Sequence, residues 1–123
     1  MTVKNPFSKN LCSPSQIEGI EIHDLVSGVL TLNELETHIL FLLFDEHLSA
    51  VELSEKTNKH RSTIQKALSN LMSKGLILRK KRGLRRGYHF TYTSIPREKV
   101  KDMMIYYVEE QTRCLKERIN KEL

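Results

Sequence analysis

Residues 51–77 read VELSEKTNKHRSTIQKALSNLMSKGLI, and their spacing predicts two short helices joined by a tight turn. The second helix carries an apolar stripe at the i, i+3, i+4 and i+7 positions, which lie on one face of a helix: Ile64, Ala67, Leu68 and Leu71. Its opposite face carries side chains of the kind that contact base edges and phosphates: Arg61, Ser62, Gln65, Lys66 and Ser69. The pattern predicts a helix-turn-helix whose second helix is a recognition helix.

Length and composition indicate one ordinary globular domain, because the chain has 123 residues of which 39% are hydrophobic. Residues 1–9 are short and polar and do not resemble a signal peptide, and the most apolar run, residues 39–44, is too short to cross a bilayer. We therefore expect a cytoplasmic protein without a membrane segment.

Positive charge is concentrated in one segment. Between Lys56 and Lys101 there are fourteen lysines and arginines against Glu98 alone, a net +13, which leaves −8 for the remainder of a chain whose net charge is +5. A basic run is often only a solvated face. Here the run begins at the helix-turn-helix and continues beyond it, which indicates a surface that neutralises phosphates.

The segments before the helix-turn-helix supply the rest of the core. Residues 1–13 read as an irregular arm, and a helix is expected from residues 13–15 to about Gly28. Thr31 and Glu34 fit a capping box that opens a second helix, apolar nearly all round as far as Phe44. Residues 48–50 are expected to form a short strand that pairs with a later hairpin.

After Gly75 the pattern changes from helical to alternating. Residues 76–82 and 88–93 flank the glycine- and arginine-containing sequence GLRRG, so they read as a β-hairpin with a basic tip, or wing. Tyr88, Phe90 and Tyr92 share one strand face and are expected in the core rather than stacked on bases.

A long helix is expected from Pro96, because some 26 residues follow without another proline or glycine. Such a helix spans about 39 Å at ~1.5 Å per residue, which exceeds what a small winged domain covers. Its surplus apolar stripe, with the stripe of the first helix, is predicted to bury itself against a second copy of the chain. The predicted dimer surface consists of Ile22, Leu25, Val26, Val29, Met104, Val108, Gln111, Leu115 and Ile119.

The predicted DNA-binding residues follow from the recognition helix and the wing: Lys59, His60, Arg61, Ser62, Thr63, Gln65, Lys66, Ser69, Lys81, Arg82, Arg85 and Arg86. Arg61, Gln65 and Lys66 are expected to read bases, and Arg85 and Arg86 to contact the backbone. His60 stands where a small capping residue is favoured. It either contacts a phosphate or is simply an exposed histidine.

The order of these elements, with LSEKTNKHRSTIQKALSNLMSKGLILRKK at its centre, resembles the MarR/TrmB-type winged helix-turn-helix transcriptional regulators of bacteria and archaea. The similarity covers residues 32–93, while the first and last helices match in pattern only. The resemblance implies a mainly α fold with a small β-hairpin, a dimer with the terminal helices at its interface, and a pseudo-palindromic operator. The wing lacks the Asp-Arg-Arg pattern of MarR members, and no TrmB-like sugar-binding domain follows it. We divide the chain into an arm (1–13), the DNA-binding domain (14–95) and the dimerisation helix (96–123).

The sequence also bears on three other functions. An enzyme is disfavoured, because no nucleophile motif, phosphate-binding glycine loop or paired-carboxylate site is present. A protein-interaction scaffold on the same fold is the main alternative, although its usual sign is an apolar or acidic recognition face. A metal sensor needs clustered ligands, whereas the five histidines are scattered. No catalytic residue, cofactor or metal is therefore predicted.

Cys12 and Cys114 lie near opposite ends of the chain outside any ligand cluster, so a disulfide framework is not expected. A dimer joined through the end helices could bring them together as a redox pair, although two unpaired cysteines in a reducing compartment usually have no such role. The sequence does not give the operator, the target genes, the direction of regulation or an effector.

Overall fold

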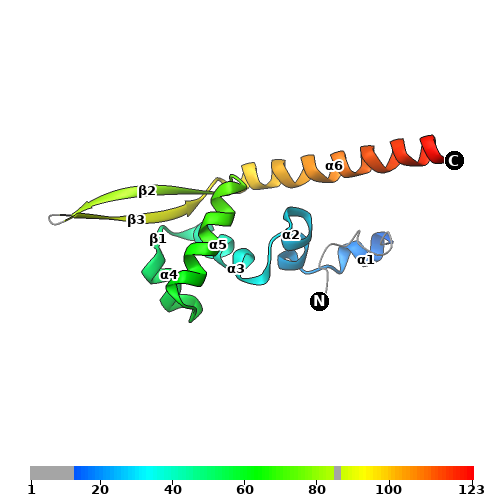
Figure 1. Ribbon diagram of the computed structural model, residues 1–123. Coiled ribbons are helices and arrows are strands. Elements are labelled where there is room, and N and C mark those ends of the chain that lie inside the picture. The colour runs from blue at the N-terminus through cyan, green and yellow to red at the C-terminus, as the bar shows by residue number, and fades with distance from the viewer. Residues whose placement is uncertain (1–12, 85–86) are drawn as a thin grey trace. The chain divides into compact units, whose positions relative to one another are not determined.

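The computed structural model describes residues 13–84 and 87–123 (Figure 1). The chain divides into two compact units, one formed by Asn33–Arg97 and the other by Met1–Leu32 with Glu98–Leu123. The wing residues Arg85 and Arg86 and the predicted arm up to Cys12 lie outside the described residues. Each unit is described below by itself.

The unit Asn33–Arg97 contains three helices and a three-stranded sheet. Its elements in chain order are α3 (Glu34–Asp45), β1 (Leu48–Ser49), α4 (Ala50–Thr57), α5 (Arg61–Ser73), β2 (Ile77–Leu84) and β3 (Gly87–Ser94). The sheet is antiparallel in the order β1-β3-β2, with Leu48 opposite Tyr92. This confirms the mainly α fold with a small hairpin and the short strand that pairs with it, although Ala50 opens α4 instead of ending β1.

The core of this unit lies where the three helices meet the sheet. Its fully buried side chains come from every layer: Ile39, Leu40, Leu43, Leu53, Ile64, Leu68, Leu71 and Leu76. The predicted stripe of α5 is therefore confirmed. The helix α3, which is apolar nearly all round, buries Ile39, Leu40 and Leu43, while Phe41, Leu42 and Phe44 are only half-buried.

The predicted start of α3 was wrong by two residues. Asn33 is the N-cap: its side chain accepts from the N–H of Glu36, whose side chain accepts from the N–H of Asn33. Thr31 instead ends the preceding helix in the left-handed conformation, at φ 57°. Two overlapping sequences fitted a capping box, and asparagine is the stronger N-cap of the two.

The expected first helix is two helices, α1 (Pro14–Glu18) and α2 (Ile22–Leu30). Ser13 caps α1 through a capping box with Gln16, and the helix ends at Gly19. Glycine loses more conformational freedom in a helix than other residues, so a helix readily ends there. The prediction of one continuous helix was therefore wrong.

The turn of the helix-turn-helix is held by its own backbone. Asn58 ends α4 in the left-handed conformation, at φ 58° and ψ 39°, and its N–H donates to the carbonyl of Ser54. The N–H of Lys59 donates to the same carbonyl, while the Ser54 hydroxyl donates to the carbonyl of Lys59. These bonds satisfy the end of α4 and direct the chain into α5.

Replacing Asn58 with alanine is expected to lower the free energy of unfolding by about 1 kcal/mol, since residues other than glycine and asparagine enter the left-handed region at a cost. Asn58→Gly is the matched control and should change stability by only a few tenths of a kcal/mol, roughly. Urea denaturation measures both. Equal losses for the two variants would mean that the asparagine side chain, not the backbone conformation, stabilises the turn.

The hairpin formed by β2 and β3 projects beyond the three helices of its unit (Figure 1). Its strands run further towards the tip than predicted, with Leu84 opposite Gly87. Of the three aromatic residues expected in the core, Tyr92 is buried and Phe90 is half-buried under the guanidinium of Arg79, whose Cζ lies 4.1 Å from the ring centroid. The side chain of Tyr88 lies outside the described part of the chain.

The last helix, α6 (Arg97–Glu122), has 26 residues, as predicted, and Pro96 lies just before it. Among its residues only Val100 is buried. Its first residue, Arg97, also ends the winged unit, where the guanidinium lies 3.2 Å from Asp45 Oδ1 and 4.4 Å from the ring centroid of Phe44. Both contacts join Arg97 to the end of α3 within the winged unit.

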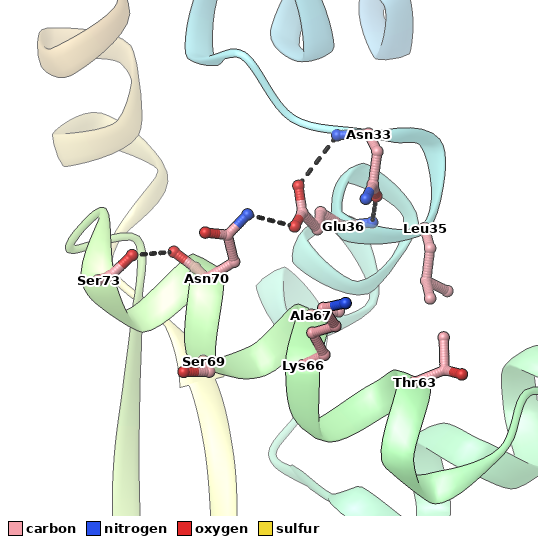
Figure 2. A pocket seen from close by; sticks show the side chains of 9 residues that line it. All are labelled: Asn33, Leu35, Glu36, Thr63, Lys66, Ala67, Ser69, Asn70 and Ser73. Carbon is pink, nitrogen blue, oxygen red and sulfur yellow. Dashed lines mark hydrogen bonds between the residues drawn. The ribbon is translucent and has the colours of Figure 1, made fainter.

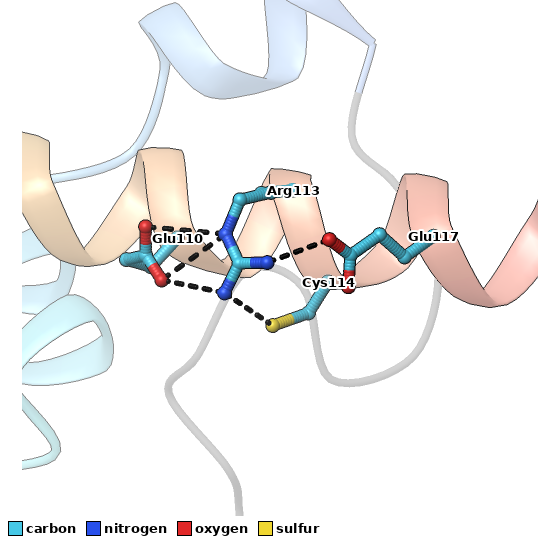
Figure 3. A network of polar contacts seen from close by, with 4 residues as sticks. All are labelled: Glu110, Arg113, Cys114 and Glu117. Atoms are coloured by element: carbon cyan, nitrogen blue, oxygen red, sulfur yellow. Dashed lines mark hydrogen bonds and ion pairs between the residues drawn. The ribbon is translucent and has the colours of Figure 1, made fainter.

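Further along α6, Arg113 binds two carboxylates on neighbouring turns (Figure 3). Its guanidinium lies 2.8 Å from Glu110 Oε1 and 2.7 Å from Glu117 Oε2. The hydrogen bond from Arg113 lowers the pKa of the Glu110 carboxyl and raises that of the arginine. The same guanidinium lies 3.8 Å from Sγ of Cys114, a free and exposed thiol. The pairs follow the i, i+3 and i, i+4 spacing that supports an exposed helix.

Within the described ranges 13–84 and 87–123, no single helix is long and apolar enough to span a membrane. The consecutive helices α2 and α3 meet the length and composition of a span only when taken together.

Candidate nucleic-acid interface

The exposed face of α5 presents a row of hydrogen-bonding side chains. All six predicted DNA-binding residues on this helix are exposed: Arg61, Ser62, Thr63, Gln65, Lys66 and Ser69. They are held outward because the opposite stripe is anchored in the core, with Ile64 and Leu68 fully buried. A rigid helix with such a face can enter the major groove and contact base edges.

His60 is the N-cap of α5 and is exposed, and its side chain makes no capping hydrogen bond. The first N–H groups of a helix without such a cap are available to an anion. Lys59 and Arg61 flank the histidine and are also exposed. The start of α5 thus combines free backbone donors with two cations, which suits a phosphate contact.

Several cations of the basic segment are already paired, whereas those of the recognition helix are not. Lys56 lies 3.4 Å from Glu46, and Arg97 is paired with Asp45. Among the residues that the structure describes, no carboxylate lies within ion-pair distance of Lys59, Arg61 or Lys66. Within the described residues, the exposed face of α5 and the turn before it therefore carry positive charge that no carboxylate offsets.

The register of the wing separates two residues that the sequence grouped together. Lys81 lies opposite Phe90, and Arg82 lies opposite His89. Because neighbouring side chains in a strand point to opposite faces, Lys81 shares a face with Phe90, while Arg82 shares the other with His89. Arg82 Nε donates to the hydroxyl of Thr91 at 3.3 Å, which holds its guanidinium over that second face.

A cavity of about 600 Å³ lies beside the recognition helix, between α5 and the first turn of α3. Figure 2 shows its lining, which includes Thr63, Lys66 and Ser69 from α5. At its edge Glu36, only 4% exposed, accepts a hydrogen bond from the side-chain amide of Asn70. Three of the predicted DNA-binding residues thus line a space beside α5 and are not enclosed by packed side chains.

The predicted dimer surface is divided between α2 and α6, and its exposure varies. Ile22 is 55% exposed, Leu115 46% and Ile119 54%, while Val26 is already buried within one chain. Gln111 is exposed, and the remaining four positions are half-buried: Leu25, Val29, Met104 and Val108. Leu115 and Ile119 lie four residues apart and therefore share one face of α6, and adjacent exposed apolar side chains favour contact with a partner.

Sequence reasoning missed Glu36 and Asn70, although a signal for the first was present. Glu36 lies three, four and seven residues before Ile39, Leu40 and Leu43, respectively, and therefore on the buried stripe of α3. A carboxylate on such a stripe requires a partner in the fold. Metal binding finds no support in the described residues, which contain no cluster of three or more histidine, cysteine or acidic side chains.

Comparison with known proteins identifies the family. The family model described as the sugar-specific transcriptional regulator TrmB matches residues 27–98, which span the winged module and its flanks. The chain belongs to the TrmB family. An uncharacterized protein of Methanocaldococcus jannaschii is 34% identical over 91 residues, which cover 73% of this chain and 76% of that relative.

Two solved structures agree with the TrmB assignment at the level of fold. A possible transcriptional regulator from Methanosarcina mazei superposes with a TM-score of 0.75 at 17% identity, covering 83% of this chain and 88% of that one. MepR of S. aureus, solved as a complex with DNA, superposes with a TM-score of 0.56 at 19% identity, and the superposition covers 80% of this chain and 84% of MepR. The family of this chain is thus one of transcriptional regulators, and its fold is the winged helix.

Proposed function

We propose that this TrmB-family protein is a sequence-specific regulator that binds double-stranded DNA as a homodimer. In this proposal α5 lies in the major groove of each half-site, and the wing lies on the backbone or in the neighbouring minor groove. Residues 14–95 contact the DNA. Residues 96–123 and the apolar stripe of α2 join the two copies, so the operator is pseudo-palindromic.

The observation that carries this proposal is the exposed row of unpaired donors on α5 beside a basic wing. Base readout requires hydrogen-bond donors held in a fixed geometry, and affinity for DNA requires cations that neutralise its phosphates. Gln65 and Arg61 satisfy the first requirement, while Lys59 and the wing cations satisfy the second. A protein-interaction scaffold would more economically present an apolar or acidic face at this position.

Selection from random duplex DNA by the intact protein is expected to enrich two inverted half-sites, with centres roughly 10 base pairs apart. Arg61→Ala/Lys66→Ala should abolish this enrichment, because it removes two donors from the recognition face. The matched control, Lys116→Ala/Lys121→Ala, removes the same charge from exposed positions on α6 and should retain it. Failure to enrich any motif, or enrichment that survives loss of Arg61 and Lys66, would contradict the proposal.

A further inference from the structure

The Glu36 carboxylate is a buried charge that joins α3 to the recognition helix. Its Oε1 accepts from the N–H of Asn33 at 3.0 Å, and its own N–H donates to Asn33 Oδ1 at 2.8 Å. Its Oε2 accepts from Nδ2 of Asn70, which lies 34 positions later in the chain, on α5. Both carboxylate oxygens are therefore occupied, one by the cap of α3 and the other by α5 (Figure 2).

Stability alone does not require a carboxylate at this position. Taking a charge out of water is costly, and a well-packed apolar side chain often serves a core equally well. What the carboxylate adds is a directed hydrogen bond, because the Asn70 amide must point at Oε2 to make it. A directed bond between two helices restricts their relative rotation more narrowly than apolar contact does.

The cavity explains why rotation of α5 needs such a bond on this side. A pocket of about 600 Å³ opens between the first turn of α3 and Thr63, Lys66 and Ser69. The opposite stripe of α5 is packed in the core, so on this flank the bond to Asn70 adds a constraint to the one that packing supplies. Asn70 lies one turn beyond Lys66 and next to Ser69. Its carbonyl accepts from the Ser73 hydroxyl at 2.7 Å and from the N–H of Lys74 at 3.2 Å, which ties it into the end of the helix.

We propose that Glu36 is a positioning residue for operator recognition: core packing sets the approximate rotation of α5, and the bond through Asn70 narrows it and thereby the direction in which Lys66 and Ser69 face. The inference rests on the proposed DNA-binding function. Neither Glu36 nor Asn70 needs to touch DNA. The effect is on specificity, because base readout depends on where the side chains of α5 point, whereas phosphate attraction tolerates small rotations.

The test exchanges the amide and the carboxylate. Asn70→Asp places two carboxylates face to face and removes the donor. The ratio of the affinity for the selected operator to that for a scrambled duplex, here called discrimination, should therefore fall roughly tenfold. Adding Glu36→Gln restores the bond with reversed polarity: the glutamine Nε2 donates to the aspartate introduced on α5, while its Oε1 still accepts from Asn33. The Glu36→Gln/Asn70→Asp double variant also has the wild-type net charge, and its discrimination should return to within about threefold of wild type.

The double variant retains the new aspartate on α5, so it separates the lost bond from the added charge. If the aspartate itself repelled DNA, discrimination would remain low in the double variant, and the proposal would be overturned. Amide resonances of residues 63–73 in the free protein supply a readout that requires no DNA. These resonances should shift in the Asn70→Asp variant and return towards their wild-type positions in the double variant. Unchanged resonances in Asn70→Asp would overturn the positioning role, whereas normal shifts with no DNA selection by the wild type would count against the proposed function alone.

Discussion

Leu115→Lys is expected to make the protein monomeric at micromolar concentration, by disrupting the proposed dimer, and to weaken operator binding about 100-fold. Leu115 is 46% exposed in one chain, so its replacement leaves the fold of the chain intact. In a dimer joined through α6 the same position becomes buried, and two unpaired ammonium groups would have to be desolvated at the interface. A monomer contacts one half-site at a time and loses the gain in effective concentration that the second half-site supplies.

Sedimentation and operator titration measure this result, and Asn120→Lys is its matched control. Asn120 is also exposed and lies about 140° further around α6 from Leu115, at about 100° per residue. Asn120→Lys adds the same positive charge as Leu115→Lys, but at a position away from the apolar stripe. This variant should therefore form the same dimer and keep the wild-type affinity for the operator. A Leu115→Lys protein that stays dimeric, or that becomes monomeric yet keeps full operator affinity, would exclude this interface.

Gln65→Ala is expected to relax the preference at one operator position, at a cost of about 1–3 kcal/mol for the preferred base. Gln65 is exposed on α5, and its amide can make a bidentate contact with adenine. Arg82→Ala should instead weaken binding to all sequences alike and flatten the slope of log affinity against log salt by about one unit, because a phosphate contact is lost. Binding titrations over a series of single-base operator variants and salt concentrations measure both effects.

Lys116→Ala controls for loss of one positive charge outside the proposed interface, and it should change neither the base preference nor the salt slope by much. The two assignments would be reversed if Arg82→Ala altered which bases are preferred while Gln65→Ala lowered affinity equally for every operator variant. The comparison does not depend on the dimer, because a single half-site suffices to show the base preference.

The recognition helix and the wing could be predicted because their signals are local and repeated. Ile64, Leu68 and Leu71 mark the buried face of α5 by spacing alone, and Gly75 adopts the left-handed conformation, at φ 75°, where the helical pattern stops. The short strand at Leu48 was also predictable, since it follows a long apolar helix and precedes a polar one. Each of these assignments depends on residues fewer than about ten positions apart.

The features that could not be predicted depend either on a choice between two local sequences or on residues far apart in the chain. Thr31 and Asn33 each began an acceptable capping box, and only the folded chain shows which one formed. The partner of Glu36 is 34 residues away, so no local pattern contains it. Neighbouring residues of a strand always face opposite sides, but the register of the hairpin was needed to show that Lys81 shares its side with Phe90 and Arg82 with His89.

The register of the hairpin also constrains how its length can change during evolution. Inserting a single residue in β2 directly after Arg79 would move Lys80, Lys81 and Arg82 each to the opposite face of the hairpin. Inserting two residues in each strand would lengthen the wing by one full pleat and return each cation to its original face. Wing strands among relatives that bind DNA in the same way should therefore differ in length by even numbers, and an odd difference should be accompanied by a bulge that restores the alternation.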